Sequence, residues 1–165
     1  MRLPILQLCG RYPIEAGCCC QSLAFVMTTS ITLAQHDLLA FDRETEPRYL
    51  RLAATRLAMV NMLAPADPGE RLELRRQTLV LWLALMSRLD QYTIGLRSPV
   101  AGDGRTDVER NRLSWQCELV DREASWQAQQ FIQRYYTHSP VDIEELRAAT
   151  AASDVSVLRR SLLFD

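Results

Sequence analysis

The feature that most constrains this chain is a series of helix-start signals, each followed by apolar residues at intervals of three and four. Such signals stand at Pro47, Asp67–Pro68, Thr106 with Glu109, and Ser139–Pro140. A Ser, Thr or Asp side chain accepts a hydrogen bond from the first helical turn, and proline fits there because that N–H has no partner within the helix. No segment alternates apolar and polar residues as a half-buried strand does. The sequence therefore predicts an all-α fold.

A chain of 165 residues is long enough for one domain with a buried core. Its 48% apolar and 24% charged residues are ordinary for a globular protein, and a net charge of −1 gives no overall attraction to nucleic acid or membrane. We expect a single-domain bundle of five to six helices around a long central helix at 107–137. The other helices are expected over residues 31–43, 46–63, 68–92 and 140–150 and after Ser153, with a loop at 94–107.

Residues 1–26 differ from the rest, because they hold four of the five cysteines and show no helical period. We interpret them as an extension that is disordered or precedes the true start at Met27, with the bundle domain at 27–165. The alternative is a lipoprotein signal, since a small residue precedes Cys18, although Glu15 stands where an aliphatic residue is usual. An odd number of cysteines suits a reducing compartment, so we expect a cytoplasmic protein. No window is long and apolar enough for a membrane span.

The segment 107–137 carries apolar residues on two opposite sides. One side is a seam typical of a helical bundle, made of Leu113, Cys117, Val120, Ala124, Ala128, Phe131 and Tyr135. Trp115, Leu119 and Trp126 lie almost directly opposite, with Arg122 between them. The tryptophans are eleven residues apart, close to three helical turns, so they point the same way about 16 Å from each other.

Two explanations of this second side remain open. The helix is either central, with other helices covering both sides, or it offers Trp115, Leu119, Arg122 and Trp126 to a partner. Trp and Arg are favoured anchors at protein interfaces. The partner would be another protein or a second copy of this chain.

The sequence lacks the residues of several chemistries. All nineteen basic residues are arginine, so there is no lysine for a phosphate-binding loop or a Schiff base, and the bias suggests a GC-rich bacterial genome. His36 and His138 are the only histidines, and neither stands in a metal-binding or hydrolase motif. Cys117 lies on the apolar seam, too far from His138 along a straight helix to form a nucleophilic pair. We predict no catalytic residue, cofactor or metal, and therefore no enzyme.

Residues 140–163 favour an alternative function, because they resemble a helix-turn-helix DNA-binding motif. Ser156, Arg159 and Arg160 would contact DNA from its second helix. Ala151 stands where a turn glycine is usual, and the segment is rich in acidic residues, which weakens phosphate binding. A structural helical hairpin accounts for the same pattern.

These observations predict a small bacterial regulatory protein that acts by binding another protein. Sequestering a transcription regulator and chaperoning a secreted protein are two activities of this kind. DNA-binding regulation is the alternative.

Overall fold

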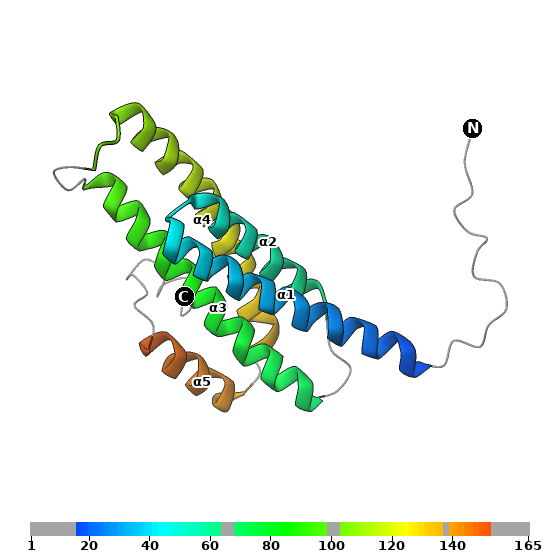
Figure 1. Cartoon of the computed structure of the whole chain (residues 1–165). Helices are drawn as coiled ribbons and strands as arrows, with labels where there is room; N and C mark the ends of the chain where they lie inside the picture. The colour runs from blue at the N-terminus through cyan, green and yellow to red at the C-terminus, as the bar shows by residue number, and fades with distance from the viewer. Residues whose placement is uncertain (1–15, 64–67, 99–102, 137–138, 153–165) are drawn as a thin grey trace, which may run out of the picture.

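The computed structural model describes residues 16–63, 68–98, 103–136 and 139–152, which form five α-helices and no strand. The helices pack as a bundle around a shared apolar core (Figure 1). The predicted all-α class is therefore confirmed. The further helix expected after Ser153 lies outside the described residues.

The first two helices form an antiparallel hairpin. Helix α1 spans Ala16–Glu44, and α2 spans Pro47–Met62 with Pro47 in its first turn. Thr45 turns the chain between them with a positive φ of 55°. The expected helix start at Ser30 is wrong, because α1 begins within the segment predicted as an extension and continues through Ser30. Met27 and Ile31 are both buried, so packing against the bundle favours helix on either side of Ser30.

The second hairpin joins α3, Pro68–Arg97, to α4, Asp107–Tyr135. The predicted start of α3 is confirmed, but the helix runs past the expected end near Tyr92. Leu96 is 5% exposed and belongs to the core, so its burial extends the helix across Gly95, which the sequence placed in a loop. The predicted start of α4 is also confirmed: the Thr106 hydroxyl accepts from the Glu109 N–H at 3.2 Å, and the Glu109 carboxylate accepts from the Thr106 N–H at 2.8 Å.

Four helices form the bundle and the fifth lies outside it. Around the bundle, α1 packs on α2, α2 on α4, α4 on α3 and α3 on α1, while α5, Pro140–Ala151, lies against α3 (Figure 1). The expected long central helix at 107–137 is not evident. Helices α1, α3 and α4 have nearly equal lengths of 29, 30 and 29 residues, and α3 is the one that packs against all four others.

A buried polar group in the last turn of α2 links three helices. Asn61 of α2 is 8% exposed, and its amide nitrogen donates to the Gln127 carbonyl of α4 at 3.0 Å. The indole N–H of Trp82, from α3, donates to the Asn61 side-chain oxygen at 3.4 Å. A buried amide is costly unless it is hydrogen-bonded, so these contacts fix how α2, α3 and α4 meet.

Several arginines join neighbouring helices through ion pairs. Arg56 of α2 contacts Asp37 of α1 at 2.6 Å, and Arg88 of α3 contacts Asp42 of α1 at 2.6 Å. Arg75 of α3 holds α5 in place and is described with the site below. The pairs lie between elements that are adjacent in the bundle, so they favour this arrangement of helices over others.

Candidate functional site

Helix α4 is anchored to the bundle through its seam. Cys117 and Ala124 are fully buried, Ala128 and Phe131 are 2% exposed, and Val120 is 9% exposed. Small residues in the middle of the seam allow close packing of helices, and Phe131 adds a large ring to the core toward the end of α4. The predicted seam is therefore confirmed, and it fixes the direction of the opposite side of the helix.

The residues predicted opposite the seam are open to solvent in the monomer. Trp115 is 64% exposed, Trp126 is 55% exposed and Leu119 is 47% exposed, and the Arg122 side chain is 77% exposed. Within the described residues no other helix covers this side, so the structure does not favour the first of the two explanations, in which α4 is packed on both flanks. The reason is its corner position in the bundle, where it packs mainly on α2 and α3. We refer to Trp115, Leu119, Arg122 and Trp126 as the tryptophan face.

Sequence reasoning missed one member of this surface. Val108 is 79% exposed and stands seven residues, or about two turns, before Trp115, so it extends the tryptophan face toward the start of α4. The sequence contains a signal that could have identified Val108, because Val108 and Trp115 share one position of a seven-residue repeat.

A shallow groove flanks the tryptophan face on the side of α2. It has a volume of about 200 Å³ and is lined by Pro47, Arg48, Arg51, Gln116, Leu119 and Val120. Arg48 forms ion pairs with Glu44 at 3.3 Å and with Glu46 at 2.7 Å, and Arg51 is exposed. The apolar part of the groove continues from Leu119, while its far wall is basic.

The exposed apolar area is large for the surface of a lone molecule. A tryptophan side chain offers roughly 150–250 Å² to a partner, so each indole here leaves about 100–150 Å² in water. With Leu119 and Val108 the surface approaches the few hundred Å² at which patches on monomers are usually binding sites. The arrangement can therefore hold another apolar surface, with Arg122 and Glu118, 3.7 Å apart, at its edge.

The other candidate groups do not form a reactive site among the described residues. Burial raises the pKa of the Cys117 thiol to about 11, so it is protonated and a poor nucleophile at neutral pH. His36 is exposed on α1, and His138 lies outside the described residues. In the described part of the chain no three His, Cys, Asp or Glu side chains are grouped to hold a metal ion. None of the described helices is long and apolar enough to cross a membrane.

Arg75 is the centre of a polar cluster that fastens α5. Its guanidinium contacts Asp142 at 2.9 Å and Glu145 at 3.0 Å, donates to the Tyr135 carbonyl, and lies 4.5 Å from the centre of the Tyr136 ring. The Tyr136 hydroxyl also donates to Glu145 at 2.9 Å, and burial together with this bond raises the tyrosine pKa. Two of the acidic residues that weakened the DNA-binding hypothesis thus hold α5 on the bundle. Ser156, Arg159 and Arg160, which that hypothesis needs, lie outside the described residues.

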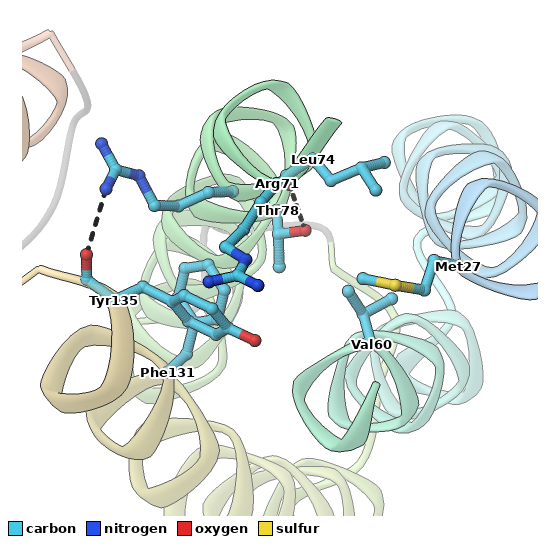
Figure 2. A pocket seen from close by; sticks show the side chains of 8 residues that line it. Met27, Val60, Arg71, Leu74, Thr78, Phe131 and Tyr135 are labelled. Atoms are coloured by element: carbon cyan, nitrogen blue, oxygen red, sulfur yellow. Dashed lines mark hydrogen bonds between the residues drawn. The ribbon is translucent and has the colours of Figure 1, made fainter. Parts of the chain in front are cut away.

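Two further hollows lie elsewhere in the bundle, and neither has the form of a ligand site. The first, shown in Figure 2, lies between Met27, Val60, Leu74, Thr78 and Phe131, and its volume of about 10 Å³ has room for one water-sized group. The second, about 420 Å³, lies between the end of α3 and the start of α4. Its Arg110 is paired with Asp103 and Asp107, and its open lining is polar, unlike the mostly apolar lining of small-molecule pockets.

Comparison with known proteins gives no relative: no family model, no curated protein and no solved structure matches this chain.

Proposed function

We propose that this protein is a small regulatory protein that acts by binding another protein through the tryptophan face. The observation that carries the proposal is the pair of indoles, each more than half exposed, on the outer side of a helix whose inner side is fully packed. Indoles supply most binding energy where a partner removes them from water, and a rigid helix presents them without a large loss of conformational entropy.

The surroundings of the indoles support a protein as the ligand. The surface is convex along α4 and is bordered by a shallow groove, whereas small molecules favour enclosed pockets. Arg122 and Glu118 at its edge suit a polar rim around an apolar centre, which is the usual anatomy of protein interfaces. Sequestering a regulator and chaperoning a secreted protein both use such a surface.

The experiment is a pull-down from cells of the source organism with three versions of the protein. The wild type is compared with the double variant Trp115→Ala, Trp126→Ala and with a control, Val80→Ala, Ile94→Ala, which removes exposed apolar side chains from α3. Proteins captured by the wild type and the control, but lost with the tryptophan variant, would support the proposal. A folded tryptophan variant that retains every partner would overturn it.

DNA binding remains the alternative prediction. It expects a gel shift that weakens steeply with salt and is lost in the variant Arg159→Ala, Arg160→Ala, because cationic contacts to phosphate release counterions.

A further inference from the structure

The tryptophan face has a spacing that reads the same in both directions along α4. Trp115, Leu119, Arg122 and Trp126 are separated by four, three and four residues, so the pattern is symmetric about the point between residues 120 and 121. A twofold interface requires a surface that is complementary to itself. An antiparallel pair of α4 helices, related by a twofold axis at that point, would satisfy the requirement.

We propose that the partner seated on the tryptophan face is a second copy of this chain, with the two α4 helices antiparallel. The inference rests on the proposed function, since it names the protein bound by the same surface. In this arrangement Trp115 of each copy lies level with Trp126 of the other, and Leu119 lies level with Arg122. Each indole thus packs beside an indole, and each Leu119 is covered by the aliphatic stem of an arginine.

One edge of this pairing brings opposite charges together on the side away from α2. Glu118 contacts Arg122 of its own helix at 3.7 Å, and both side chains are mostly exposed. The symmetry places Glu118 of one copy at the height of residue 123 along the α4 helix of the other copy. This height is one residue past Arg122 of that copy. Arg122 therefore lies between two carboxylates, one from each copy, and opposite charges across an interface fix its register.

The other edge pairs an acidic residue with the basic wall of the groove. Glu123 lies on the α2 side of the helix, because it accepts from Gln127, which in turn contacts Asn61 of α2. The symmetry places Glu123 of one copy level with residue 118 of the other, beside Leu119 and the groove. Arg51 lines that groove and is exposed, so it faces the incoming carboxylate.

The available area suits a dimer of moderate affinity. The exposed parts of Val108, Trp115, Leu119 and Trp126 amount to roughly 400 Å² of apolar surface per copy, and the charged edges add a similar area. The total from two copies falls near the middle of the roughly 1,200–2,000 Å² that specific interfaces bury. We expect a dissociation constant in the micromolar range.

The first test is the mass of the full chain by sedimentation equilibrium over a wide concentration range. The wild type and the control Val80→Ala, Ile94→Ala are expected to shift from monomer to dimer, whereas Trp115→Ala, Trp126→Ala should raise the dissociation constant at least about a hundredfold. Circular dichroism verifies that each variant remains helical. A wild type that stays monomeric throughout, or a tryptophan variant that dimerises like the control, would overturn the inference.

The edge on the side of α2, where Glu123 meets Arg51 of the other copy, gives a second test. A variant that merely unfolds could not produce the result expected from it. Reversal of either charge, in Arg51→Glu or Glu123→Arg, should weaken the dimer about tenfold through repulsion. The double variant restores the pairing in swapped form, so its dissociation constant should return toward that of the wild type. Effects of the two reversals that simply add would contradict this contact.

The antiparallel register is tested by photo-crosslinking. Trp115 is replaced by benzoylphenylalanine, and the labelled chain is mixed with ¹⁵N-substituted chain so that cross-links between copies are recognised by mass. We expect them at residues 123–130 of the second copy, while cross-links at 112–119 would show a parallel pair and overturn the inference.

If the chain is monomeric and the tryptophan variant still loses a different protein in the pull-down, this inference fails and the proposed function stands. If no protein depends on the tryptophans and the chain is monomeric, both fail.

Discussion

Helices α3 and α4 are nearly equal in length and both carry tryptophan, yet the tryptophan of α3 is buried and those of α4 are exposed. Trp82 of α3 is 1% exposed, whereas Trp115 and Trp126 of α4 are 64% and 55% exposed. The difference comes from position. Helix α3 packs against four helices, including α5, while α4 occupies a corner and packs mainly on α2 and α3. Trp82, on the inner side of α3, is therefore part of the core, and the indoles on the outer side of α4 are available to a partner.

The largest effect is expected from removing the buried indole. Trp82→Ala should lower the free energy of unfolding by about 3–5 kcal/mol, because it leaves a cavity and removes the donor to Asn61. Urea denaturation followed by circular dichroism measures the change. A loss below about 1 kcal/mol would mean that α3 is no more central than α4.

Removing the residue that fastens α5 to α3 should have the next largest effect. Arg75→Met leaves Asp142 and Glu145, whose side chains are 14% and 18% exposed, without this guanidinium, and we expect a loss of about 2–4 kcal/mol. Hydrogen exchange should rise in residues 140–151 and change little in α1. The control Arg147→Met removes an exposed arginine from α5 and should leave exchange unchanged. Equal exchange in both variants would show that Arg75 does not hold α5.

The inner side of α4 should respond to alkaline pH. Burial raises the pKa of Cys117 from 9.0 to about 11, so the folded state favours the neutral thiol. The contribution of the neutral thiol to the free energy of unfolding is complete below the pKa that Cys117 has in the unfolded chain. It is lost as the pH rises toward the pKa that Cys117 has in the folded protein. Between pH 8 and pH 10.5 the wild type should therefore lose about 2 kcal/mol more stability than Cys117→Ala. Burial also raises the pKa of Tyr92, and the charge of the nearby Cys117 thiolate adds to this, so the difference between the two proteins reports the thiol together with its effect on Tyr92. Parallel pH profiles would contradict a buried thiol.

The smallest effect is expected from the outer side of α4. In dilute solution, where the chain is monomeric, Trp115→Ala with Trp126→Ala should change the free energy of unfolding by less than about 1 kcal/mol, because more than half of each tryptophan is already exposed. Chemical denaturation at low protein concentration measures this value. A loss as large as that expected for Trp82→Ala would show that the two helices do not differ as described.

Local signals predicted much of the fold from the sequence. The Thr106–Glu109 capping box and the seam of α4 depend on residues close together in the chain, and both are confirmed. The start of α1 and the end of α3 were wrong because they depend on tertiary packing. Met27 and Leu96 are buried by other helices, and no local pattern shows which helices those are.

The sequence predicted which residues form the candidate site, but not whether other helices cover them. Periodicity placed Trp115, Leu119, Arg122 and Trp126 on one side of a helix, but it left open whether the bundle covers that side. Coverage depends on which corner α4 occupies and where α5 docks. The latter is set by Arg75, a residue remote in sequence from both α5 and the tryptophan face.

Fluorescence quenching by acrylamide tests most directly whether the outer side of α4 is uncovered until a protein binds it. In Trp82→Phe protein, shown by circular dichroism to be folded, Trp115 and Trp126 are the only tryptophans, so selective excitation of tryptophan reports on these two. We expect both to be strongly quenched and red-shifted in dilute monomer, and to become protected with a blue shift as the protein associates. Indoles that are already protected in the most dilute sample would contradict the account, because the chain itself would then cover that face.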